Sequence, residues 1–151
     1  MIASPPSAQD LPAWQWELFL AGFAALWAGL SFYFAGASDW RLLATKFRTS
    51  DTPEGECFRN QVYGVGSIHE RGATVLTVTP QGLHLRAALP FRLGHPPLLI
   101  PWRSILRVVR GKSWWTEWYS LNVEDTTLIR VGPRAFEAMA RYLPSPVNAA
   151  A

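Results

Sequence analysis

An uncharged stretch of twenty residues, 18–37, constrains this chain more than any other feature of its sequence. As a helix it would be about 30 Å long, which matches the hydrocarbon core of a bilayer. It is apolar on all sides, with Trp14 and Trp16 before it and Trp40 after it. Aromatic residues of this kind collect at membrane–water interfaces. We therefore predict one transmembrane helix over residues 13–38; a buried helix of a soluble protein is the alternative.

The charges on either side of this segment predict its orientation. No Lys or Arg precedes it, whereas Arg41, Lys46 and Arg48 follow it closely. Basic residues gather on the cytoplasmic side of membrane helices. We therefore expect the N-terminus outside and the rest of the chain on the cytoplasmic side.

Side chains along the segment are expected to contact lipid or a neighbouring helix. Those that we assign to the membrane span are Leu18, Phe19, Leu20, Gly22, Ala25, Trp27, Gly29, Phe32 and Phe34. Small residues recur every fourth position at Ala21, Ala25 and Gly29, a spacing that lets two helices approach closely. Besides the lipid bilayer, two partners stay open: a second copy of this chain or a larger membrane protein.

The rest of the chain divides by composition and pattern. We expect a disordered tail at 1–12, a juxtamembrane helix and linker at 39–55, a β domain at 56–144 and a second disordered tail at 145–151. In the juxtamembrane helix, Trp40, Leu43 and Phe47 share one face.

After residue 56 the apolar pattern changes to a period of two, which is typical of β-strands. The strands that we predict lie at 61–67, 74–79, 83–89, 98–101, 105–110, 114–123 and 127–131. Pro133 then begins a helix with an apolar stripe, and Pro144 ends it. The fold class expected is therefore mainly β, a small barrel or sandwich of about seven strands capped by one C-terminal α-helix.

This order of elements, together with two stretches of sequence, resembles a known group of folds. The segment GLHLRAALPFRLGHPPLLIPWRSILRV is similar to a passage of bacterial pleckstrin-homology (PH)-like and GRAM-like domains. More narrowly, WRLLATKFR, EGECF and FRLGHPPLLIPW resemble uncharacterised bacterial membrane proteins with one transmembrane helix. The resemblance spans about residues 40–143. It implies a PH-like fold and a bacterial inner membrane, but no particular activity, because a fold does not fix a function.

The hairpin sequence RVVRGKSWW is the most suggestive surface for binding. Arg107, Arg110 and Lys112 precede Trp114 and Trp115. Cations beside amphipathic aromatic rings suit anionic lipid headgroups or a protein partner. The alternative, which we favour for most of these aromatic residues, is that they fill the core of the small barrel.

A second candidate contact is Arg92 with His95, in the loop before Pro96. Arg92, together with Arg103, is able to pair with a phosphate or carboxylate, and His95 either binds a ligand or orients the loop. His84 alternates with leucines and is expected to point to solvent.

Other classes of function find little support in the sequence. The three histidines and Cys57 lack metal-ligand spacing, and no nucleophile motif or glycine-rich phosphate loop occurs. Residues 41–151 carry 14 basic and 8 acidic groups, a difference of +6, without a long basic run that would suit nucleic acid. We therefore expect no enzyme and no cofactor. The role predicted is a membrane-anchored PH-like module that binds a protein or anionic lipid; the alternative is an accessory subunit of larger membrane proteins.

Overall fold

The computed structural model describes residues 12–69, 72–89, 91–124 and 126–144. The chain divides into two compact units, Met1–Leu30 and Ser31–Ala151, which are described separately. The boundary falls inside helix α1 (Ala13–Ala37), so the last two turns of that helix belong to the second unit. The tails predicted at 1–12 and 145–151 lie, apart from residue 12, outside the described residues.

Helix α1 is long and apolar enough to cross a membrane. Its 25 residues include an 18-residue window of mean hydropathy 1.8, of which 11% is buried. Leu18, Phe19 and Leu20 each expose more than 60% of their surface. Among the described residues, this part of the helix thus has little of the burial that is typical of a core helix.

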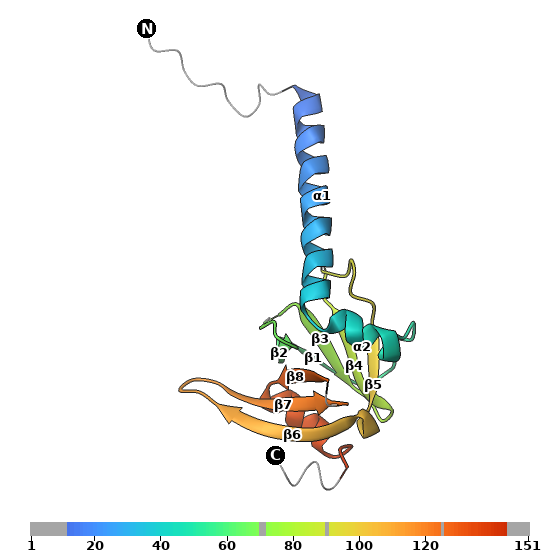
Figure 1. Ribbon diagram of the computed structural model, residues 1–151, viewed down its shortest axis with the longest axis vertical. Coiled ribbons are helices and arrows are strands. Elements are labelled where there is room, and N and C mark those ends of the chain that lie inside the picture. Colours follow the sequence, from blue (N-terminus) through green and yellow to red (C-terminus); the bar gives the residue numbers. More distant parts are fainter. Residues whose placement is uncertain (1–11, 70–71, 90, 125, 145–151) are drawn as a thin grey trace. The chain divides into compact units, whose positions relative to one another are not determined.

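Helix α2 (Trp40–Phe47) packs on strand β5 (Leu98–Pro101) and contributes to the core of the second unit (Figure 1). Trp40 and Leu43 are each 2% exposed, and the Trp40 indole N–H donates to the Pro96 carbonyl at 2.9 Å. We expected residues 39–55 to form a juxtamembrane helix and a linker. The predicted helix is present, but it is part of the folded domain because its apolar face is buried there.

Two antiparallel four-stranded sheets form the body of this unit. The first sheet has the order β1 (Glu56–Arg59), β3 (Thr74–Val78), β4 (Gly82–Ala87) and β5. The second has the order β2 (Val62–Val65), β8 (Thr127–Val131), β7 (Glu117–Val123) and β6 (Ile105–Lys112). A short 3-10 helix, η2 (Trp102–Ser104), carries the chain from the first sheet to the second.

The chain also changes sheet between β1 and β2. Asn60 lies between these strands with φ 58°, a left-handed conformation in which Asn is among the better tolerated residues. The described residues thus contain eight strands, where we predicted about seven. Strand β1 was missed because it is an edge strand that is mostly exposed and so lacks the alternation that marks a half-buried strand.

The core lies between the sheets and is closed by helix α3 (Pro133–Ala140), which contacts β3 and β7. Ala135, Phe136 and Met139 are its buried residues, and the Phe136 ring stacks on the Tyr119 ring with centroids 3.8 Å apart. This confirms a mainly β fold with a C-terminal helix. The helix is shorter than the predicted 133–143, although Leu143 is still buried.

The burial of His84 contradicts one prediction from the sequence. We predicted that it points to solvent, but it is 3% exposed, while Leu83 and Leu85 on the opposite face of β4 are fully buried. Both faces of this strand are therefore covered. The backbone of Asp51, in the segment after α2, acts on the pKa of this imidazole and so lies close to it.

Candidate functional site

The tryptophan-bearing hairpin is made by β6 and β7 and extends beyond the other strands of its sheet (Figure 1). Lys112 pairs with Glu117, and the turn closes with a hydrogen bond from the Ser113 N–H to the Thr116 carbonyl at 2.7 Å. Trp114 and Trp115 lie in this turn and are 91% and 89% exposed. The predicted strand 114–123 thus begins only at Glu117, and these two rings are not core residues, contrary to the interpretation that we favoured.

Charges on the hairpin largely satisfy one another. Arg110 Nε lies 2.5 Å from Glu117 Oε1, and this hydrogen bond is the main reason that the pKa of the Glu117 carboxyl is lowered. The same contact raises the pKa of Arg110. Arg110 is therefore already paired, whereas Arg107 and Lys112 are cations on β6 for which no ion pair is present among the described residues. The hairpin has exposed aromatic rings but a reduced excess of positive charge.

A cavity of about 550 Å³ lies beside the hairpin. Trp118 and Arg130 are among its lining residues, and Trp118 covers Gly111 across the ladder so closely that no side chain fits at that glycine. Its lining includes both apolar and polar groups. Nothing in this arrangement concentrates charge or nucleophilic chemistry.

The loop between β4 and β5 brings the second pair of predicted residues together. Arg92 and His95 both line a cavity of about 290 Å³, and Arg86 from β4 lines it as well. His95 is 7% exposed, and its ring meets the Trp40 ring edge-on with centroids 5.2 Å apart. One imidazole nitrogen lies 3.3 Å from the Leu93 carbonyl. His95 is thus held by its neighbours and shapes the wall, while the two arginines supply the charge.

A second cavity of about 450 Å³ adjoins these arginines, and Arg59, Arg86 and Arg92 all line it. Val75 pairs with Arg59 on β1 and with Arg86 on β4, so these three residues form one row across the outer face of the sheet. Residues paired directly on neighbouring strands point to the same face. Among the described residues, no acidic side chain lines either cavity. We call Arg59, Arg86 and Arg92 the arginine cluster.

Sequence reasoning identified Arg92 but missed Arg59 and Arg86. The pattern of β4 did place Arg86 opposite the leucines. Arg59, however, lies on the strand that was not predicted, and its approach to Arg86 depends on the register of three strands.

The same loop packs on the last two turns of α1, inside the second unit (Figure 1). Gly94 has φ 79°, and a Cβ at this position would lie 2.9 Å from Phe32 Cδ1 and 3.3 Å from Ala35 Cβ. Ala35 is fully buried. Leu89 and Leu93 in this loop are nevertheless 74% and 49% exposed. An exposed apolar loop edge therefore lies beside the arginine cluster and against the end of the apolar helix.

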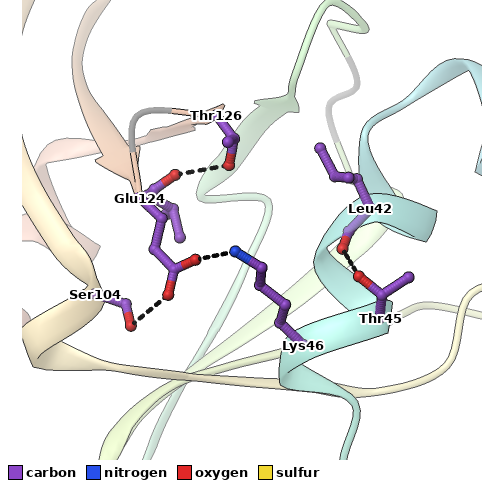
Figure 2. A network of polar contacts seen from close by, with 7 residues as sticks. Leu42, Thr45, Lys46, Ser104, Glu124 and Thr126 are labelled. Carbon is purple, nitrogen blue, oxygen red and sulfur yellow. Dashed lines mark hydrogen bonds and ion pairs between the residues drawn. The ribbon is translucent and has the colours of Figure 1, made fainter.

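Figure 2 shows a polar network that is structural in character. Lys46 Nζ on α2 lies 2.6 Å from Glu124 Oε2, and the Ser104 hydroxyl is 3.4 Å from Glu124 Oε1. The Lys46 hydrogen bond is the main cause of the lowered pKa of Glu124. The network joins α2 to the end of β7 and to η2, so it braces the domain.

Two further predictions concern metal ligands and the small-residue face of α1. Among the residues that the structure describes, no three His, Cys, Asp or Glu side chains are grouped as metal ligands would be, and Cys57 is a free, exposed thiol. On α1, a Cβ added at Gly22 or Gly29 would meet no described atom within 4 Å. Assembly through this small-residue face stays a prediction.

Comparisons of this chain with protein-family models, with curated proteins and with solved structures gave no match. The resemblance to bacterial PH-like membrane proteins therefore stays a prediction, and function has to be argued from the geometry alone.

Proposed function

We propose that this chain is a membrane-anchored, non-enzymatic PH-like module that lies on the cytoplasmic face of a bacterial inner membrane. There it would bind a protein partner or an anionic lipid surface. The observation that carries the proposal is helix α1, which has 25 residues and contains an 18-residue window of mean hydropathy 1.8, of which 11% is buried. An exposed apolar surface of this size is unfavourable in water. Lipid covers it well, because a helix satisfies its own backbone hydrogen bonds inside a bilayer.

The loop at Gly94 gives this proposal a second support. Phe32 and Ala35, which it touches, lie five and two residues before the end of α1 at Ala37. At 1.5 Å per residue, the contact lies about 3–8 Å inside the helix end. If α1 spans a bilayer, this loop lies at the headgroup region, and its exposed Leu89 and Leu93 are then covered by lipid.

The topology supports the PH-like part of the proposal. Counting β1 and β2 as one strand bent at Asn60 gives seven strands in two antiparallel sheets, followed by one helix that closes the core. This is the order of elements that the resemblance implies. The orientation rests on Arg41, Lys46 and Arg48, which follow the span.

The single cysteine provides a direct test. Cys57 is exposed and belongs to the β domain. In bacterial cells that express the full chain, we expect a membrane-impermeant maleimide to label Cys57 only after the inner membrane is opened. As a matched control, a chain with Cys57→Ser and Ser4→Cys should be labelled from the outside of spheroplasts.

Two results would count against the proposal. Labelling of Cys57 in intact spheroplasts would reverse the orientation. Recovery of the full chain in the soluble fraction without detergent would overturn the membrane anchor itself, because α1 would then be covered by protein.

A further inference from the structure

We propose that the arginine cluster binds the phosphate of an anionic phospholipid, with the acyl chains of that lipid lying along Leu89 and Leu93. This inference rests on the proposed membrane anchoring and adds to it a ligand class and a binding site. The site is made by β1, β4 and the loop that follows β4.

Three arginines that line one cavity suit an anion. Arg59, Arg86 and Arg92 line the 450 Å³ cavity, and two of them also line the neighbouring 290 Å³ cavity. Within the described ranges, none of the three takes part in an ion pair. Arginine presents several N–H donors in a planar fork that matches the oxygens of a phosphate. Since no described carboxylate neutralises them, an outside anion is the partner that this cluster lacks.

The backbone holds the cluster in place. Arg59 and Arg86 both pair with Val75, so the ladder fixes their separation across one strand. Arg92 lies in a loop whose Gly94 is pressed against Phe32. The larger cavity falls in the size range of sites for small molecules, so a headgroup fits into it.

The surroundings favour a lipid over a soluble phosphate. Leu89, which lines the larger cavity, is 74% exposed, and Leu93 is 49% exposed. Both lie in the loop that contacts the last turns of α1. A phosphate at the arginines would therefore lie beside exposed apolar side chains, which is the arrangement of a headgroup next to its acyl chains.

The tryptophan hairpin is a weaker site for the same ligand. Arg110 is already bound to Glu117, and Trp114 and Trp115 stand about nine-tenths exposed in a turn. Neither ring lines any of the cavities at the protein surface that are described above.

Lipid retention by the full-length protein tests the proposal. The chain is reconstituted in nanodiscs of phosphatidylcholine with a minority of phosphatidylglycerol, extracted in mild detergent, and its retained lipids are measured by mass spectrometry. We expect phosphatidylglycerol to be enriched over phosphatidylcholine. The double substitution Arg86→Gln/Arg92→Gln should lower the enrichment by about fivefold for each arginine, the effect of one basic residue at an anionic leaflet.

The matched control is Arg134→Gln/Arg141→Gln, which removes the same charge at two exposed positions outside the cluster. This variant should retain the enrichment of the natural sequence. Arg86→Lys/Arg92→Lys keeps the charge and should lose part of the enrichment, since Lys lacks the planar fork. Circular dichroism of each variant, and its presence in the membrane fraction, show that it is folded and anchored.

A second measurement separates the two sources of phosphate. Inorganic phosphate and glycerol 1-phosphate are titrated against the protein in phosphatidylcholine nanodiscs and followed by ³¹P NMR. Binding of these soluble probes without phosphatidylglycerol enrichment would overturn the lipid ligand. Equal enrichment in the cluster variant and the control variant would overturn the site. In both cases the labelling of Cys57 would stand unchanged, so the anchoring proposal is judged separately.

Discussion

His84 shows how a single buried side chain couples this fold to pH. Its position alternates with leucines on β4, yet the segment around Asp51 covers the outer face and leaves it 3% exposed. Burial lowers the pKa of the imidazole, and the positive charge of Arg86 lowers it further, while the hydrogen bond with the Asp51 backbone acts in the opposite direction. Nε2 of this ring is buried without a hydrogen-bond partner among the described residues. The native state therefore favours the neutral form of the imidazole more than the unfolded chain does.

We predict that this histidine makes the domain sensitive to acid. In the unfolded chain His84 titrates near 6.5, and in the native state it titrates lower. Above pH 6.5 the imidazole is neutral in both states, and its burial does not reduce the free energy of unfolding. As the pH falls from 6.5 towards the native pKa, the unfolded state binds the proton first, and the free energy of unfolding decreases. The slope for one proton is at most about 1.4 kcal/mol per pH unit.

Urea unfolding at a series of pH values measures this effect. His84→Gln should flatten the dependence below pH 6.5, whereas His69→Gln, at an exposed position, should leave it unchanged. An identical pH dependence in His84→Gln and the natural sequence would show that another group is responsible.

At the scale of elements, the contact between the β4–β5 loop and the end of α1 depends on one glycine. Gly94 has φ 79°, and a Cβ would come within 2.9 Å of Phe32 Cδ1. A left-handed conformation costs a residue with a side chain about 1–2 kcal/mol. We expect Gly94→Ala to lower the free energy of unfolding by at least this amount, measured by thermal unfolding of the full chain in detergent.

Two companion variants separate backbone strain from the steric clash. Phe32→Ala in the Gly94→Ala background removes the clash but keeps the strained φ, so it should restore only part of the stability. Gly29→Ala, where nothing lies within 4 Å, should leave the unfolding temperature of the β domain unchanged. Full stability in Gly94→Ala would show that the loop is not held against the helix in this way.

At the scale of the whole molecule, the division into two units predicts that the β domain folds without the apolar helix. The buried cluster runs from Trp40 to Leu143 and includes no residue of the first unit. We expect residues 38–151 to unfold cooperatively and to stay in solution without detergent, because the large exposed apolar surface of α1 is gone.

Hydrogen exchange on this fragment adds a local test. Loss of Phe32 and Ala35 should speed amide exchange in the loop around Gly94, while the amides of β3 and β4 stay protected. A fragment without a cooperative transition would show that the last turns of α1 are needed for folding.

Several elements of the fold followed from local pattern. The β-branched run of β3 and the alternation of β4 predicted two strands that are present, and Trp40, Leu43 and Phe47 predicted the face of α2. Strand β1 and the exact limits of the hairpin did not follow, because an edge strand and a turn with two tryptophans have no hydrophobic alternation to reveal them.

The candidate site divides in the same way. Arg92 and His95 are close in sequence and were predicted together, and they do line one cavity. Arg59 is 33 positions from Arg92 and lies beside Arg86 only because of the β1–β3–β4 register. No local sequence pattern could therefore have predicted it as a site residue.

By itself the sequence determined the features that depend on neighbours along the chain: an apolar helix long enough to span a bilayer, strands that alternate, and a helix that begins at Pro133 and ends before Pro144. The tertiary structure decided which side chains are covered and which charges meet. His84 became buried, Trp114 and Trp115 became exposed, and three distant arginines came to line one cavity. Periodicity reports only the direction in which a side chain points, whereas burial and charge clustering depend on which distant segment lies in that direction.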